Sequence, residues 1–234
     1  MPETGHEIII VNDGSNDGTS EVLREISDVQ IINRDENRGY GYSIKEGIEK
    51  SLAGKIMIID ADGSYPVAMA GELLSHADNN SMVIGERKVN RFCMAFLNRA
   101  AKIIIRIVIF ILSKHWIKDF NSGMRVFDKS LAKRYWNLFP DGFSFTTTIT
   151  VATLIENEKI KFIPIIYNKR VGNSKLPRVS SFFGFILLVS RITIYFRPLR
   201  FYLLFSSIFF LLFILRAARD VYVTNSFGNA SLIL

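Results

Sequence analysis

The segment EIIIVNDGSNDGT, residues 7–19, decides the fold class of this 234-residue chain. Its first half is rich in β-branched side chains and predicts a buried strand that ends at Asn12 and Asp13. Gly14 permits a tight turn, and Asp17 is a suitable cap for a following helix. A strand that leads directly into a helix is typical of an α/β domain.

The same alternation continues through the first two-thirds of the chain. Strand-like runs are expected at 29–34, 55–62 and 82–86, and helical patterns at 41–52 and after Pro66. Strands that alternate with helices predict a mostly parallel sheet with helices on both faces. Ligands of such sheets bind at the carboxyl ends of the strands, and here those ends read VNDGSNDGT, DADGS and GER.

Composition limits the classes of protein and of metal site. Apolar residues make up 49% and charged residues 22% of the chain, which excludes a disordered, collagen-like or coiled-coil protein. A single cysteine excludes an intramolecular disulfide framework, and the three histidines are scattered. A bound metal would therefore be held by carboxylates, which favours Mg²⁺ or Mn²⁺.

The motif DADGS places two carboxylates at the end of one strand. Asp60 and Asp62 are two residues apart, so their side chains point the same way on an extended chain. Such like charges repel, and a divalent cation that also neutralises a diphosphate is a common solution. The alternative is a solvated acidic turn, which is as frequent for this motif alone.

The first acidic turn allows two interpretations. Asp13, with Asn12, is positioned to accept hydrogen bonds from a nucleotide base or ribose. The alternative is a capped strand-to-helix turn with no ligand. A receiver domain also has an acidic pair after a strand, but it leaves DADGS and the apolar C-terminal region unexplained.

The C-terminal region combines positive charge with long apolar runs. From residue 169 onward there are nine basic residues and one acidic residue, a charge of +8, whereas residues 1–168 carry 20 basic and 21 acidic residues, a charge of −1. Residues 182–196 are apolar with Arg191 near the middle, which favours a helix in the membrane interface. Residues 201–215 contain no charge and are flanked by arginines, which favours a transmembrane helix over a buried core helix.

Topology signals place the first part of the chain in the cytoplasm. No signal peptide pattern precedes the first strand, and the basic residues lie beside the apolar run. The positive-inside rule then predicts an integral membrane protein with residues 1–180 on the cytoplasmic face.

Six motifs in order, VNDGSNDGT, DADGS, GER, NSGMRVF, FPDGFSFTT and RVGNSKL, cover residues 11–176. Together they resemble the family 2 glycosyltransferases of the GT-A fold, in the branch of dolichyl- or polyprenyl-phosphate sugar synthases. The resemblance implies an inverting hexosyltransferase that moves a sugar from a UDP- or GDP-linked donor to a polyprenyl or dolichyl phosphate. It also implies Mg²⁺ or Mn²⁺ as cofactor, a lipid bilayer as partner and no role for nucleic acid.

The resemblance also implies roles for individual residues. Asn12 and Asp13 would bind the nucleotide, and Asp60 and Asp62 would contact the metal and the nucleotide sugar, with Asp62 a catalytic residue. Apart from the resemblance, Asp119, six residues before Arg125, is expected to orient the acceptor as a second catalytic residue. The residues implied for the acceptor phosphate are Arg87, Arg99, Arg125, Arg170, Ser174 and Lys175.

Two departures from the family pattern are visible. Relatives begin with an additional strand that ends in a P-x-Y-N-E-like segment, so a central strand is expected to be missing and the chain to be truncated at both ends. Ser64 stands where close mannose-transferring relatives have glutamine, which puts a third metal contact and the sugar identity in doubt.

The expected domains follow from these boundaries. Residues 1–176 form the catalytic domain, 177–198 a juxtamembrane amphipathic helix, 199–218 a transmembrane helix, and 219–234 a loop with the start of a second transmembrane helix. The expected fold is thus a GT-A α/β domain followed by interfacial and transmembrane helices.

Two other functions remain open at this level. A processive polysaccharide synthase would need a Q-x-x-R-W motif, and the single glutamine, Gln30, is in no such context. A membrane-anchored nucleotide-sugar binder without turnover is compatible with a missing strand. Binding without turnover would separate this binder from the enzyme.

Overall fold

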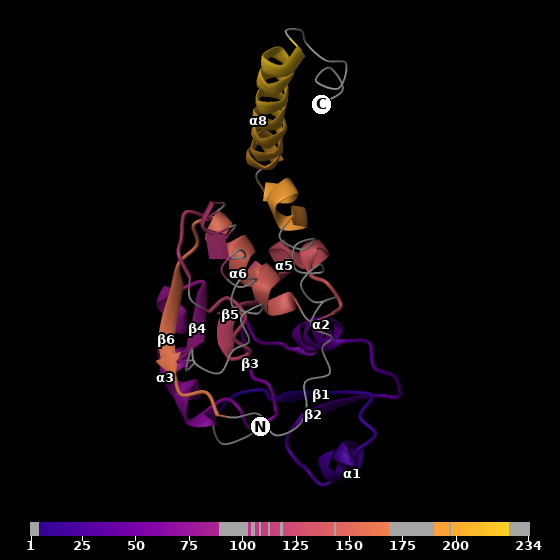
Figure 1. The fold of residues 1–234 in the computed structure, drawn as a ribbon. Helices are drawn as coiled ribbons and strands as arrows, with labels where there is room; N and C mark the ends of the chain where they lie inside the picture. The colour runs from indigo at the N-terminus through magenta and orange to yellow at the C-terminus, as the bar shows by residue number, and fades with distance from the viewer. Residues whose placement is uncertain are drawn as a thin grey trace. The chain divides into compact units, whose positions relative to one another are not determined.

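A computed structural model describes residues 5–88, 103–168 apart from 104–105, 108, 112, 118 and 143, and 190–224 apart from 197. The chain divides into two compact units, Met1–Val189 and Ser190–Leu234. The first unit contains the strands and most of the described helices, and the second contains one long helix (Figure 1).

The first unit contains two sheets. β1 (Ile9–Asp13) and β2 (Gln30–Arg34) form a parallel pair. The second sheet has the order β3-β5-β4-β6. Its strands are β3 (Lys55–Ile58), β4 (Met82–Arg87), β5 (Arg125–Asp128) and β6 (Ile160–Ile165).

The second sheet is mostly parallel, as expected, except for one antiparallel strand. β5 is antiparallel to both β3 and β4, whereas β4 and β6 are parallel. The reason lies in the connection between β4 and β5. Gly85 N–H donates to Met124 O, and Arg125 is in register with Ile58 and Ile84. The chain therefore re-enters the sheet at the edge where β3 and β4 end, and β5 has to run back.

Helices cover the sheets. They are α1 (Thr19–Arg24), α2 (Tyr40–Lys50), α3 (Ala70–Ser75), α5 (Lys129–Arg134) and α6 (Phe145–Ile155), with short 3₁₀ turns at Val67–Met69, Ala77–Asn79 and Trp136–Leu138. All residues of α6 are buried, although its sequence contains five threonines. A core cluster joins α3 to β4, β5 and β6 through Leu73, Val83, Val126 and Ile163. Strand–helix alternation was thus predicted correctly, and the α/β class is confirmed.

β1 and β3 are each hydrogen-bonded on one side in the part of the chain that the structure describes. β1 pairs with β2, and β3 pairs with β5. An unpaired strand edge leaves backbone N–H and C=O groups without a sheet partner. The expectation of one more strand beside β1 agrees with these edges and stays a prediction.

The second unit is dominated by α8 (Pro198–Thr224), and residues 190–196 are also helical. A 23-residue stretch, Phe201–Val223, contains an 18-residue window with a mean hydropathy of 2.1 and is long and apolar enough to cross a membrane. The helix extends beyond residue 218, where the transmembrane helix was expected to end. Arg216 and Asp220 form an ion pair at 3.6 Å across one turn, which lets the helix continue. Of the segment 219–234, expected to be a loop with the start of a second transmembrane helix, residues 219–224 belong to α8 and residues 225–234 lie outside the described residues.

Candidate active site

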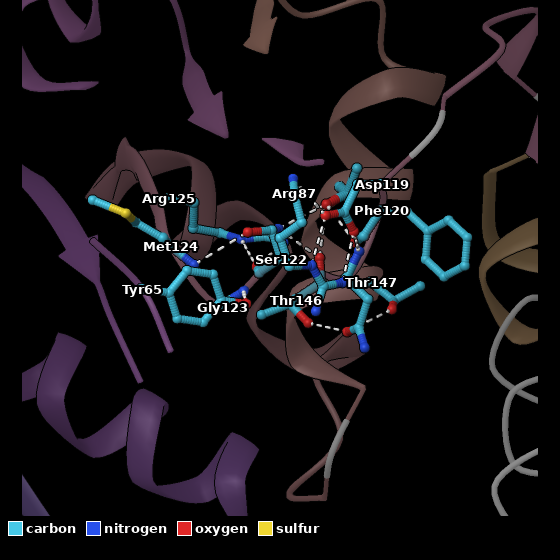
Figure 2. Close-up of polar contacts among 12 residues, drawn as sticks. Tyr65, Arg87, Asp119, Phe120, Ser122, Gly123, Met124, Arg125, Thr146 and Thr147 are labelled. Atoms are coloured by element: carbon cyan, nitrogen blue, oxygen red, sulfur yellow. Dashed lines mark hydrogen bonds and ion pairs between the residues drawn. The ribbon is translucent and has the colours of Figure 1, made fainter. Parts of the chain in front are cut away.

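The candidate site lies at the carboxyl ends of β3 and β4, where the segment Asp119–Met124 returns to the sheet (Figure 2). Asp60 and Asp62 follow β3, and Arg87 is the last residue of β4. The antiparallel entry of β5 brings a third segment to this edge. Side chains from three distant parts of the sequence are therefore collected at one place.

The two aspartates after β3 are half-buried and engaged by short-range contacts. Asp60 Oδ1 accepts a hydrogen bond from the Tyr40 hydroxyl at 3.0 Å. Asp62 Oδ1 accepts the Ser64 N–H at 3.1 Å and also the Ser64 hydroxyl. Ser64 itself is fully buried. The residue that departs from the family pattern thus closes the turn that holds Asp62.

The donor set at this turn suits a cation that is shared with a ligand. Among the described residues, no group of three or more His, Cys, Asp or Glu side chains gathers at one point. Mg²⁺ and similar hard cations are often held by one or two carboxylates, with waters and substrate phosphates as the remaining ligands. Asp60 and Asp62 therefore fit Mg²⁺ or Mn²⁺ bound together with a diphosphate.

Arg87 and Asp119 form a two-pronged ion pair at the end of β4 (Figure 2). Arg87 Nε donates to Asp119 Oδ2 at 2.7 Å and Nη2 to Oδ1 at 2.8 Å, while the Arg87 backbone N–H also donates to Oδ2 at 3.1 Å. Burial pushes the pKa of Asp119 upward, but the hydrogen bonds and charge of Arg87 hold it below its usual value. Asp119 is therefore an anion that fixes the guanidinium.

Two tyrosines complete the surroundings of Arg87. The guanidinium carbon of Arg87 lies 5.3 Å from the centre of the Tyr167 ring. Tyr65 and Tyr167 pack edge to face at 5.1 Å, and the Tyr65 hydroxyl accepts the Gly123 N–H at 2.6 Å. The Arg87 guanidinium is thus held by Asp119 on one side and by an aromatic ring on the other, which limits the rotamers of the Arg87 side chain.

Arg125 is placed in the core, which corrects its predicted role at the acceptor phosphate. It is fully buried, and its guanidinium donates to Ser122 O at 3.0 Å, Thr146 O at 2.7 Å and Thr150 Oγ1 at 2.7 Å. Burial lowers its pKa to about 10. These hydrogen bonds connect the Asp119–Met124 segment to α6, so Arg125 stabilises the position of that segment from within the core.

The turn after β1 is more structural than its sequence suggested. Asn12 is buried, donates to Ser20 Oγ and Asn33 Oδ1, and accepts the Ser15 N–H, so its amide is occupied within the protein. A role for Asn12 in nucleotide binding stays a prediction. Asp13 reaches across to the start of α2 instead.

Asp13 is held at the N-terminus of α2. Its carboxylate accepts the N–H groups of Arg38 and Gly39 at 2.9 and 2.8 Å, and Arg34 Nη1 at 2.9 Å. Burial raises the pKa of Asp13, and these hydrogen bonds together outweigh burial and bring it below the usual value. The anion organises the segment that precedes α2. A role in nucleotide binding stays a prediction.

Several predicted residues lie outside the described residues: Arg99, Arg170, Ser174 and Lys175. Their assignment to the acceptor phosphate stays a prediction. Tyr40, Tyr65 and Tyr167, in contrast, lie in the site although sequence reasoning did not select them. The only local signal was the pattern of Gly39 and Gly41 around Tyr40, because two glycines beside one tyrosine suggest close packing.

Several relatives among curated proteins are lipid-phosphate sugar transferases by name. The chain is 28% identical over 217 residues to a dolichyl-phosphate beta-glucosyltransferase of Trichomonas vaginalis, covering 84% of this chain and 62% of the relative. It is 24% identical over 198 residues to an undecaprenyl-phosphate 4-deoxy-4-formamido-L-arabinose transferase of Aeromonas hydrophila, covering 79% and 55%. The chain thus spans about three-fifths of the length of these relatives.

Solved structures show the fold. A crystal structure of glucosyl-3-phosphoglycerate synthase from Mycobacterium tuberculosis, in complex with Mn²⁺, uridine diphosphate and phosphoglyceric acid, matches with a TM-score of 0.60. The identity is 13%, and the match covers 80% of this chain and 66% of that one. This likeness confirms the GT-A fold. The sequence model described as Glycosyl transferase family 2 matches residues 2–136, more than half of the chain, and the chain therefore belongs to glycosyl transferase family 2.

Proposed function

We propose that this chain is the catalytic part of a membrane-bound transferase that moves a sugar from a nucleoside diphosphate to a polyprenyl phosphate. The main support for the proposal is that acidic and basic side chains lie at the same edge of one sheet. Asp60 and Asp62 lie at the end of β3, and the Arg87–Asp119 pair lies at the end of the next strand but one. The names of the relatives support the same class of acceptor, a lipid phosphate.

The donor half of the site would be built on Asp60 and Asp62. These carboxylates would hold Mg²⁺ or Mn²⁺ against the diphosphate of the nucleotide sugar. Such a cation neutralises the charge that develops on a departing diphosphate. Ser64 holds Asp62 in one orientation through two hydrogen bonds, so little ordering remains for the moment of binding.

The acceptor half would be built on Arg87. A phosphate monoester has a second pKa near 6, so it is mostly a dianion at neutral pH and needs no general base. Its oxygen would attack the anomeric carbon, the bond from that carbon to the diphosphate oxygen would break, and inversion would result. Asp119 does not touch the substrate in this scheme. It orients Arg87, whose charge would attract and align the phosphate.

The long apolar helix supports the lipid acceptor. Phe201–Val223 is long and apolar enough to span a bilayer, and most of its described apolar side chains are exposed. A membrane anchor would keep the site at the surface where a polyprenyl phosphate presents its headgroup. The proposed location is the membrane, with the first unit on the cytoplasmic side.

The test is transfer of radiolabelled sugar from a panel of UDP- and GDP-sugars to polyprenyl phosphate in detergent. Asp62→Ala should abolish transfer, and removal of divalent cations with EDTA should do the same. Asp78→Asn, in an exposed carboxylate, is the matched control and should keep full activity. Transfer that persists in EDTA or in Asp62→Ala would contradict the donor half of the proposal.

The acceptor half is tested separately with Arg87→Ala. We expect the KM for polyprenyl phosphate to rise by at least tenfold, since a hydrogen bond to a charged group contributes about 1.5–3 kcal/mol. The KM for the nucleotide sugar should change much less. An equal loss for both substrates would assign Arg87 to the donor site or to the fold.

A further inference from the structure

We infer that Tyr40 and Gly123 are positioning residues that fix the carboxylate of Asp60 in its cation-binding orientation. The inference rests on the cation site of the proposed function. Tyr40 donates its hydroxyl hydrogen to Asp60 Oδ1 at 3.0 Å. Gly123 packs against the carboxylate itself, because a Cβ built at position 123 would lie 2.3 Å from Asp60 Oδ2, 2.7 Å from Cγ and 2.8 Å from Oδ1. The carboxylate is thus hydrogen-bonded at Oδ1 and packed against a position that tolerates no side chain.

Tyr40 is held by the docking of α2 onto the segment Pro140–Gly142. Gly41 N–H donates to Gly142 O at 3.0 Å, and the next N–H, of Tyr42, donates to Asp141 O at 2.9 Å. A Cβ at Gly41 would lie 2.1 Å from Pro140 O, so only glycine allows this approach. The first turn of α2 is therefore fixed by backbone contacts. Tyr40, between Gly39 and Gly41, has little freedom to move away from Asp60.

Gly123 is held from the other side of the site (Figure 2). Its N–H donates to the Tyr65 hydroxyl at 2.6 Å, and its neighbour Met124 accepts the Gly85 N–H at 2.9 Å through its carbonyl oxygen. Ser122 O accepts two hydrogen bonds from the buried Arg125 guanidinium. The backbone at position 123 is thus a rigid wall, and the Asp60 carboxylate packs against this wall and accepts the Tyr40 hydroxyl.

A fixed carboxylate binds a cation better than a mobile one, because less side-chain ordering is left for the binding step. Partners that hydrogen-bond to metal-ligating groups typically change metal affinity by 10- to 100-fold when they are removed. The Tyr40 hydroxyl binds one lone pair of Oδ1, whereas an ionised carboxylate has about four lone-pair sites in all.

The geometry also connects the two halves of the site. The wall that contacts Asp60 belongs to the segment Asp119–Met124, whose first residue holds Arg87. A displacement at Gly123 would disturb both the donor and the acceptor half of the site. Loss of the Tyr40 hydroxyl would disturb the donor half alone. The two variants therefore have different expected signatures.

The test measures Mn²⁺ affinity of the full-length chain in detergent by electron paramagnetic resonance, with and without UDP. Tyr40→Phe keeps the ring and removes the hydroxyl, and we expect the Kd for Mn²⁺ to rise about tenfold. UDP binding in EDTA and the melting temperature should stay unchanged. Any transfer activity lost in Tyr40→Phe should return at saturating Mn²⁺, whereas a merely destabilised chain would not respond to the metal.

Gly123→Ala is the second variant and should weaken Mn²⁺ at least as much, because its methyl group would overlap Asp60. Gly54→Ala, where the added Cβ meets no atom within 4 Å, and Tyr222→Phe, at a side chain that is 92% exposed, are the matched controls. Asp60→Asn should remove most Mn²⁺ binding, and its loss of affinity defines the largest effect expected of the other variants.

Wild-type Mn²⁺ affinity in both Tyr40→Phe and Gly123→Ala would overturn the inference. A wild-type chain that binds no Mn²⁺, even with UDP, would overturn it together with the proposed donor site. A wild-type chain that binds Mn²⁺ and UDP but transfers no sugar would contradict the proposed reaction alone. In that case a weaker Mn²⁺ affinity of the two variants still supports the positioning of Asp60.

Discussion

At the scale of single residues, each buried charged side chain is compensated by specific hydrogen-bond partners. Arg87 and Asp119 are 32 positions apart in sequence, yet three hydrogen bonds join them. Asp13 is matched in the same way by Arg34 and by two backbone N–H groups. Because both carboxylates have a pKa below the usual value, each stabilises the folded state only while it is ionised.

Acid should therefore destabilise this chain more than exposed carboxylates would predict. The stabilisation from Asp13 and Asp119 is fully present above the ordinary aspartate pKa of 3.8 and is lost as the pH falls through their lower folded values. Urea unfolding at a series of pH values from 7 to 3 measures the loss.

The Asp119→Asn variant isolates one part of that acid effect. At pH 7 it should be less stable by about 3–5 kcal/mol, since it leaves the Arg87 charge largely buried with a neutral partner. Below pH 4 its stability should fall less steeply than that of the wild type. A pH profile parallel to the wild type would show that Asp119 is not ionised in the folded protein.

At the scale of elements, α2 depends on close backbone contact with the segment 140–142. Gly41→Ala should destabilise the chain by about 1–3 kcal/mol, because its Cβ would overlap Pro140 O and Gly142 O. Gly71→Ala is the control, since Gly71 lies in α3 with no atom near the added Cβ. There the change should stabilise by up to about 1 kcal/mol through helix propensity. Thermal melts of both variants compare the two; equal melting temperatures would contradict the close contact.

A second prediction at this scale concerns the edge strands of the two sheets. A strand supplied upstream that paired with the open edges of β1 and β3 would bury four or five apolar side chains, at roughly 1.5–3 kcal/mol each. A chain extended upstream by such a segment should melt at a higher temperature and be stabilised more by UDP or GDP. If both lengths melt cooperatively at the same temperature with equal nucleotide stabilisation, the sheets need no further strand.

At the scale of the whole molecule, the apolar helix should decide where the protein resides. Ile208→Arg places a charge near the middle of the span and should disfavour insertion by about 2.5–3.5 kcal/mol. Val223→Arg is the matched control, because an arginine at the end of the span can extend to the membrane surface. Carbonate extraction of membranes that contain each variant measures insertion. Equal extraction of Ile208→Arg, Val223→Arg and the wild type would contradict a spanning role for α8.

Much of the fold could be read locally from the chain. Apolar runs that end in Asp60 and Asp62, or in Gly85–Arg87, indicate strands whose carboxyl ends lie at the candidate site. Hydrophobic periodicity and turn residues are local properties of the sequence. The same is true of the long apolar helix, whose length and lack of charge are visible in one window of sequence. The order of the motifs was enough to indicate the family that the family comparison shows.

The amino-acid sequence was enough to predict the α/β alternation and the acidic turns, because these depend on neighbours within a few residues. A cation held at those turns stays a proposal. Only the tertiary structure decided that β5 runs antiparallel, that Arg125 lies in the core and that Tyr40 holds Asp60. Each of these depends on packing between segments far apart in the chain. A solvated arginine and a buried one have the same local sequence signal, and their difference arises from what the fold places around the guanidinium.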